Sequence, residues 1–355
     1  MNSARILNIG MIGLGGVAQA HLQAFDILSN VRLAAVCDVR KEAATEVAQR
    51  FSAKAFTDYQ TLLADDSLAL DLVMVLTPAS THRGIVEAVA EKKLPVFCEK
   101  PIAVTLEDAE AMIAACKKAA LPLFYGSSYR YLPAVVKAKA LIASGAIGEV
   151  QLITEQLIGG NGKDAYQQLP PIHYPLGGPG GPGMGLVDHG VHLIDIIPWL
   201  TDSPITHAYG RGHISGAPAS TEFMVMHLAN GAMGHLLYNA ATYSSALPNE
   251  GMFSGGQAWR TDASVADAGG WNDEPGSIAV YGSHGSLRIF HYTNALFINN
   301  GEGPQQIAVT GRPAFEHFAT QLEACATALN EGHTPKVTGE DGLTALNVLL
   351  KVYAA

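Results

Sequence analysis

The fold of this chain is decided by the stretch Ile6-Leu7-Asn8-Ile9-Gly10-Met11-Ile12-Gly13-Leu14-Gly15-Gly16-Val17-Ala18. An apolar run leads directly into a glycine-rich turn, and an amphipathic segment follows to about Ser29. Strand, glycine turn and helix in this order are typical of a dinucleotide-binding unit, because the glycines let a pyrophosphate approach the free N–H groups of the helix. The turn residues predicted to contact such a cofactor are Gly13, Gly15, Gly16, Val17 and Ala18.

An acidic residue follows the second apolar run. Residues 32–37 read as a strand that ends at Asp38, about 20 residues beyond the turn, where a carboxylate would bind a ribose hydroxyl. The charge of Asp38 repels a 2′-phosphate, so it favours NAD. Arg40 and Lys41 could neutralise that phosphate, which keeps NADP open, and Arg40 is counted among the cofactor contacts. In a simpler interpretation, Asp38 only caps the next helix.

Strands and helices continue to alternate as far as residue 125. The predicted strands are continuous apolar runs, as expected when helices cover both faces of a parallel sheet. This pattern predicts an α/β Rossmann domain. Predicted helices cover about 58–64, 81–92 and 106–120, and predicted strands cover 72–76, 95–98 and 121–125.

Two of these strands end in polar residues, at the edge where such sheets bind ligands. Thr77, Pro78 and His82 follow one strand, and Glu99 and Lys100 follow the other. All five are predicted cofactor contacts. Lys100 is also a candidate catalytic residue, because its ammonium would lie near the nicotinamide end of the cofactor. Two interpretations of His82 stay open, a cofactor contact or a residue that only caps backbone.

The size and composition of the chain limit what it can be. At 355 residues two domains are expected, residues 1–125 and 126–355, and the C-terminal helices can pack back on the first. Apolar residues make up 48% and charged residues 15%, as in globular proteins, and the net charge of −10 argues against a nucleic-acid partner. No apolar run reaches membrane-spanning length, no signal-peptide pattern is found, and the four cysteines are scattered. We therefore expect a cytoplasmic protein with no membrane partner.

After residue 126 alternating strand patterns replace the βα repeats. A glycine- and proline-rich loop, Gly177–Gly183, and a long polar segment, 242–275, interrupt them. The segment is interpreted either as a lid or oligomer contact, or as a floppy insertion. Predicted strands cover 150–157, 205–211, 222–228, 234–239, 277–281, 286–290 and 296–298, and predicted helices cover 133–144, 314–330 and 339–353.

The stretch 185–195 gathers charge and imidazole inside an apolar frame. As a helix it would place Asp188, His192 and Asp195 on one face and turn its aliphatic residues toward a core. Asp188 and His192 are candidate catalytic residues, and Asp195 is expected to be structural. A metal site formed by Asp188, His189, His192 and Asp195 is the competing interpretation. We expect no metal, because nicotinamide chemistry needs none.

Taken together, these motifs resemble the Gfo/Idh/MocA oxidoreductases, a family named for glucose–fructose oxidoreductase and inositol dehydrogenase. The resemblance covers nearly the whole chain. The residues that carry it are the glycine turn at 13–18, Thr77-Pro78 with His82, Glu99-Lys100-Pro101, Tyr129-Arg130-Tyr131-Leu132-Pro133, Gly145–Val150, Asp188-x-Gly190-x-His192-x-x-Asp195, Tyr281–Arg288 and Thr338–Gly342.

The resemblance implies a Rossmann domain and a C-terminal α/β domain with an open, mainly antiparallel sheet that packs in a homodimer or homotetramer. It also implies a tightly held NAD(P), sugar or cyclitol substrates, and a catalytic set of Lys100, Asp188 and His192. His189 occupies a variable position of the motif and, with Arg130, Tyr174 and Trp271, is a candidate substrate contact. Three activities stay open. They are an NAD(P)-dependent dehydrogenase acting on secondary alcohols, a redox-neutral enzyme that recycles bound NAD, and a non-catalytic dinucleotide or sugar sensor.

Overall fold

The computed structural model describes residues 5–160, 186–211, 221–243, 277–313 and 315–353. The described residues form two compact units, which are treated separately below. The first comprises 5–128 and 318–346, and the second comprises the remainder. Tyr174, Trp271, the glycine- and proline-rich loop and most of segment 242–275 lie outside the described residues.

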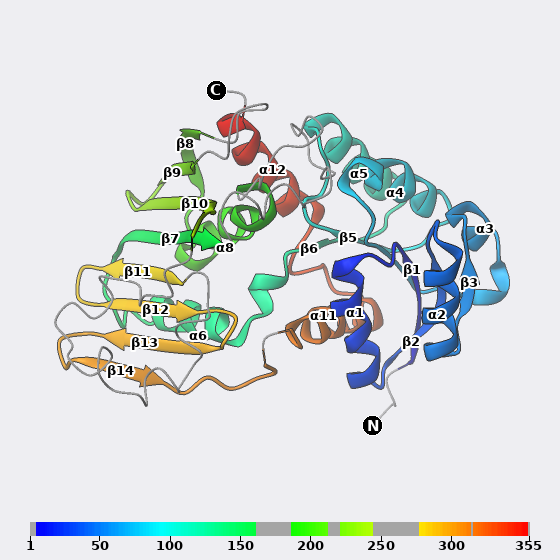
Figure 1. Cartoon of the computed structure of the whole chain (residues 1–355), viewed down its shortest axis with the longest axis horizontal. Helices are drawn as coiled ribbons and strands as arrows, with labels where there is room; N and C mark the ends of the chain where they lie inside the picture. Colours follow the sequence, from blue (N-terminus) through cyan, green and yellow to red (C-terminus); the bar gives the residue numbers. More distant parts are fainter. Residues whose placement is uncertain (1–4, 161–185, 212–220, 244–276, 314, 354–355) are drawn as a thin grey trace. The chain divides into compact units, whose positions relative to one another are not determined.

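The first unit is built on a six-stranded parallel sheet with strand order β3-β2-β1-β4-β5-β6 (Figure 1). The chain runs from β1 outward to β3 and then returns to the other side of β1, so the order reverses between β1 and β4. The strands are β1 (Leu7–Ile12), β2 (Val31–Cys37), β3 (Lys54–Phe56), β4 (Leu72–Val75), β5 (Val96–Glu99) and β6 (Leu123–Gly126).

Helices cover both faces of this sheet. On one face α1 (Gly16–Ile27), α2 (Lys41–Phe51) and α11 (His317–Glu331) share an apolar cluster with β1. On the other face the first turns of α12 (Gly339–Tyr353) pack on Leu123 and Tyr125. That face also carries α3 (Tyr59–Leu63), α4 (His82–Glu91) and α5 (Leu106–Lys118), and short 3-10 turns lie at η1 (Asp66–Leu68) and η2 (Ala79–Thr81).

The second unit contains an eight-stranded sheet with order β14-β13-β12-β11-β7-β10-β9-β8. Only β7 and β10 pair in parallel, and the other neighbours are antiparallel. The strands are β7 (Val150–Gly160), β8 (Ile205–Arg211), β9 (Glu222–Leu228), β10 (Met233–Tyr243), β11 (Ile278–Gly282), β12 (Ser286–Phe290), β13 (Ala295–Asn299) and β14 (Pro304–Ile307). The helical elements are η3 (Ser128–Tyr131), α6 (Pro133–Ala143), η4 (Leu186–Gly190) and α8 (Val191–Thr201).

The expected α/β architecture is confirmed: a parallel Rossmann sheet is followed by a mainly antiparallel one. In the second unit, alternate residues of β9 and β10 are buried toward the core, and α6 and η4 with α8 pack on the sheet. No helix in the described part of the chain is long and apolar enough to cross a membrane. All four cysteines are free thiols and buried.

Candidate functional site

Four strand ends of the first unit lie in register along one edge of the sheet. The paired residues at this edge are, in spatial order, Cys37, Ile12, Val75 and Cys98. The residues that follow them are Asp38, Gly13, Leu76 and Glu99. The edge spans the point where strand order reverses, which is where open parallel sheets bind ligands. The predicted cofactor residues all belong to the segments that leave this edge.

The glycine turn leaves room for a phosphate group at the N-terminus of α1. A Cβ atom added at Gly15 or Gly16 would meet no described atom within 4 Å. The first turn of α1 carries no acidic side chain, so the partial positive charge of the helix terminus is not neutralised there. These residues fit a dinucleotide. The turn backbone would hold its pyrophosphate and Asp38 a ribose hydroxyl.

Gly13 has a different role from Gly15. Its φ is +95°, and an added Cβ would lie 2.7 Å from the carbonyl carbon of Leu76. We expect Gly13→Ala to lower the free energy of unfolding by about 2–4 kcal/mol, because it combines backbone strain with a main-chain clash. Gly15→Ala, the matched control, should change stability by less than about 1 kcal/mol and instead weaken cofactor binding. Urea unfolding measures both, and equal stabilities would contradict this account.

Asp38 is anchored at the end of β2. Its Oδ2 accepts the N–H of Leu14 at 2.8 Å, and its Oδ1 accepts the backbone N–H and Nε of Arg40 at 2.9 Å each. Burial acts to raise the pKa of this carboxyl, but the hydrogen bonds from Arg40 and Leu14 outweigh burial and keep the pKa below its usual value. Asp38 is therefore anionic at neutral pH and orients the glycine turn through Leu14.

His82 supports the loop after β4. Its Nε2 lies 2.8 Å from the carbonyl oxygen of Thr77, and its Nδ1 lies 3.0 Å from that of Ile102 and 3.2 Å from Sγ of Cys98. Burial lowers the pKa of His82 and raises that of Cys98. A neutral imidazole can donate to only one of the two carbonyl oxygens that face its ring nitrogens. His82 thus positions the backbone at Thr77, and direct contact with a cofactor stays a prediction.

Glu99 fixes the backbone at Lys100. The buried carboxylate accepts the N–H of Lys100 at 2.8 Å, and its other oxygen lies 2.7 Å from Nε2 of His21. His21 comes from the buried face of α1 and was not predicted from the sequence. The side chain of Lys100 is half-buried at the carboxyl end of β5, and its peptide bond to Pro101 is cis. Glu99 is a support for Lys100 at this edge.

In the second unit, the expectation of one regular helix over 185–195 is wrong. A π-helical turn, η4, precedes α8, so Asp188 and His192 do not have α-helical spacing. The wider turn accompanies a hydrogen bond from the N–H of Leu186 to the buried Glu222, at 3.0 Å. Such a side-chain contact competes with the regular helical register. The side chain of Asp188 is outside what the structure describes.

His192 and Asp195 lie in α8 and are buried. The ring of His192 stacks on Tyr129, with 4.1 Å between centroids and 7° between planes. Asp195 accepts two hydrogen bonds from the guanidinium of Arg130, at 2.8 and 2.6 Å. Arg130 therefore holds the buried Asp195 carboxylate through an ion pair, and the structural role of Asp195 stays a prediction. Substrate contact by Arg130 stays a prediction.

His189 joins a cluster that the sequence did not reveal. Its Nε2 lies 3.0 Å from Oε1 of Glu155, and the hydroxyl of Tyr238 donates to Oε2 at 2.5 Å. Burial acts to raise the pKa of Glu155, but the charge and hydrogen bond of His189 outweigh it, so the pKa is lowered. Burial lowers the pKa of His291 to about 4. The hydroxyls of Tyr129 and Tyr292 are hydrogen-bonded to each other beside His189.

Two family models match this chain. One, described as an oxidoreductase family with an NAD-binding Rossmann fold, matches residues 7–127, and the Gfo/Idh/MocA C-terminal domain matches residues 135–288. The chain belongs to the Gfo/Idh/MocA oxidoreductase family. Both units of the structure therefore have counterparts in that family, and the first is an NAD-binding Rossmann domain.

Relatives within the Gfo/Idh/MocA family include dehydrogenases of several small molecules. Myo-inositol 2-dehydrogenase of Thermotoga maritima is 24% identical over 96% of this chain and 93% of its own length. D-apiose dehydrogenase of Paraburkholderia graminis is 34% identical, but the match spans only 39% of this chain and 36% of that enzyme. The structure of aldose-aldose oxidoreductase from Caulobacter crescentus has the same fold, with a TM-score of 0.77, 23% identity and coverage of 99% and 97% of the two chains.

Proposed function

We propose that this protein is an NAD-dependent dehydrogenase that oxidises a secondary alcohol of a sugar, a cyclitol or a sugar derivative. The observation that carries the proposal is the single sheet edge that bears Asp38, the glycine turn, Thr77 and Lys100 in spatial order. A dinucleotide could lie along this edge, with a ribose next to Asp38 at the end of β2 and the nicotinamide next to Lys100. The relatives, myo-inositol and D-apiose dehydrogenases, support a polyhydroxylated substrate.

The reaction assigns a role to each candidate side chain. When bound, a nicotinamide would supply the acceptor for the hydride of the carbinol carbon. His192 accepts the proton of the hydroxyl, because an imidazole exchanges protons near neutral pH. Lys100 polarises that hydroxyl or relays its proton, and Asp188 orients the groups and holds a neighbouring hydroxyl.

A substrate panel tests the proposal. Polyols, aldoses and glycosides are offered with NAD or NADP, and the absorbance band of reduced nicotinamide is followed. We expect NAD to be reduced stoichiometrically with at least one class. Product formed without net reduction of soluble NAD would indicate the redox-neutral alternative. No turnover with any compound, despite tight dinucleotide binding, would indicate the sensor.

Asp38 is proposed to select NAD over NADP. Asp38→Asn removes the negative charge but keeps an oxygen that can accept the N–H of Leu14. We expect the ratio of NADP to NAD affinity to rise about tenfold or more, because the 2′-phosphate no longer meets a carboxylate and can pair with Arg40. Arg40→Gln should move the ratio in the opposite direction. Titration of both nucleotides by protein fluorescence measures it, and an unchanged ratio in Asp38→Asn would count against this role.

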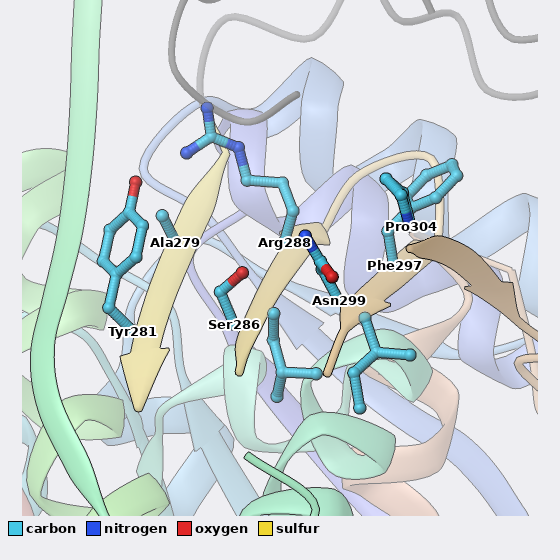
Figure 2. A pocket seen from close by; sticks show the side chains of 9 residues that line it. Ala279, Tyr281, Ser286, Arg288, Phe297, Asn299 and Pro304 are labelled. Atoms are coloured by element: carbon cyan, nitrogen blue, oxygen red, sulfur yellow. The ribbon is translucent and has the colours of Figure 1, made fainter. Parts of the chain in front are cut away.

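We also propose that the second sheet supports a homodimer or homotetramer through its open face. Strand register places Tyr281 beside Leu152, and Phe223 beside Leu237, on the face opposite the helices. Tyr281 and Phe223 are 38% and 37% exposed. Figure 2 shows the same face at β11 to β13, where Tyr281 lines a pocket with Ser286, Arg288 and Asn299. Apolar and aromatic side chains gathered on one face are typical of an interface.

Negative charge introduced on this face tests whether the face forms the subunit interface. We expect the double variant Phe223→Glu, Tyr281→Glu to sediment as a monomer, because two unpaired carboxylates would have to be desolvated on association. Val136→Glu on α6, where Val136 is 46% exposed, is the control and should sediment like the unmodified protein. If the double variant keeps the same mass as the control, this face is not the interface.

A further inference from the structure

Three side chains that converge between the sheet and η4 form a group suited to a metal ion. They are Glu155 on β7, His189 in η4 and His291, which directly follows β12. One potential ligand atom of each lies within 4.8 Å of those of the other two. Glu155 and His291 are 1% and 0% exposed, and His189 is largely buried. All three belong to the second unit, so the arrangement does not depend on the first.

The spacing of these atoms is close to that of a coordination sphere. Around an ion bound at roughly 2.1 Å, neighbouring ligand atoms lie roughly 3.0–3.5 Å apart. Oε1 of Glu155 and Nε2 of His189 are already 3.0 Å apart. The remaining separations, at most 4.8 Å, need the side chains to close by at most about 1.3–1.8 Å, which side-chain rotation of histidine and glutamate can supply.

Glu155 and His189 make further polar contacts on the side away from the other ligands, and these contacts favour the forms of the two side chains that can bind a metal ion. Oε2 of Glu155 accepts the hydroxyl of Tyr238, which leaves Oε1 on the side of the imidazoles. Nδ1 of His189 lies 3.4 and 3.5 Å from the hydroxyls of Tyr129 and Tyr292. A proton on Nδ1, directed at these oxygens, would leave the Nε2 lone pair facing Glu155. Ligand histidines and carboxylates are commonly held by such outer partners.

We propose that Glu155, His189 and His291 bind one zinc-class divalent ion. Two imidazoles and one carboxylate are a donor set that such ions prefer, and three protein ligands leave a position for an oxygen from water or a small molecule. The site adjoins His192 through Tyr129, whose ring stacks on His192 and whose hydroxyl reaches His189. The competing interpretation is a hydrogen bond between Glu155 and His189 with no bound ion.

Metal content tests this proposal without any measurement of turnover. The full chain, free of any histidine tag, is stripped with a chelator, reloaded with excess Zn²⁺, and desalted before elemental analysis. We expect about one zinc per chain, and less than about a tenth of that in Glu155→Gln and in His291→Gln. His227→Gln on β9, where the strand register turns the side chain to the opposite face, is the matched control and should keep full occupancy.

A second measurement covers the case in which the variants fail to fold. Co²⁺ added to the stripped unmodified protein should give visible absorption bands of a four- or five-coordinate site, saturating at one equivalent and abolished by equimolar Zn²⁺. The proposal is overturned by zinc at background level, by full zinc in folded Glu155→Gln and His291→Gln, or by the absence of saturable cobalt bands. Loss of zinc in His227→Gln, with zinc retained in Glu155→Gln and His291→Gln, would show that the bound zinc is an adventitious ion only, held at the surface.

Discussion

Lys100→Met is expected to lower kcat by about a thousandfold while leaving the unfolding temperature nearly unchanged. The substitution removes the ammonium but keeps an unbranched side chain of similar length. Electrostatic stabilisation of a developing oxyanion contributes about 10²–10³ in rate, and positioned proton transfer about 10²–10⁴. The carboxylate of Glu99 accepts the backbone N–H of Lys100. The substitution retains this hydrogen bond, because it changes only the side chain. Steady-state kinetics on the best substrate of the panel gives the loss.

Lys92→Met provides the control for Lys100→Met. Lys92 follows α4 and precedes β5, so the same side-chain change is made near the opposite end of that strand. We expect its kcat to match that of the unmodified enzyme. If Lys100→Met retains more than about a tenth of the activity, Lys100 is not a catalytic residue.

His192→Asn should lower kcat/KM for alcohol oxidation by about 10²–10⁴ through loss of the proton acceptor. A base must be deprotonated to act, so in the unmodified enzyme kcat/KM should rise with pH as this group loses its proton. The variant should lack that rise if His192 is the base. His207→Asn on the exposed part of β8 is the control and should keep the full profile. A rise that persists unchanged in His192→Asn would assign the proton to Lys100 instead.

The double variant Lys100→Met, His192→Asn shows whether the two groups serve one step. If they act on the same proton, the loss in the double variant should be well below the product of the two single losses. Multiplicative losses would mean that the two side chains make independent contributions to the rate.

Much of the first unit could be predicted because its signals are local and strong. Continuous apolar strands, the glycine turn and Asp38 at a strand end each follow from parallel-sheet geometry. The elements that escaped prediction have weak signals. β3 and β14 are short and largely exposed, and α2 buries Ala44, Val47 and Ala48, small side chains that give a faint apolar pattern.

The supporting residues of the candidate site were harder to predict because their partners are distant in sequence. His21 and Glu99 are 78 residues apart, and Glu155 and Tyr238 are 83 apart. The sequence did contain one indication of these buried residues. Glu155 falls in the buried register of β7, two residues after Ile153, and His21 lies beside Leu22 on the buried face of α1. A charged or titratable residue in an apolar register indicates a buried partner.

The π-helical turn could not be predicted from spacing alone. The sequence pattern of 185–195 is compatible with an α-helix, and its residues Val187, Val191 and Ile194 are buried as that pattern requires, as is Ile197 two residues beyond it. At this turn two carboxylates of the sheet, Glu222 and Glu155, contact Leu186 and His189. Those contacts exist only once the sheet has formed.

Hydride transfer itself is the most direct measurement of the central claim. The best alcohol of the panel, deuterated at the carbinol carbon, is incubated with NAD, and the nicotinamide and product are analysed by mass spectrometry. The account predicts one deuterium on the reduced nicotinamide for each ketone formed, with none lost to solvent. Deuterium that appears in water, or an alcohol that is consumed while the nicotinamide stays unlabelled, would contradict a dehydrogenase.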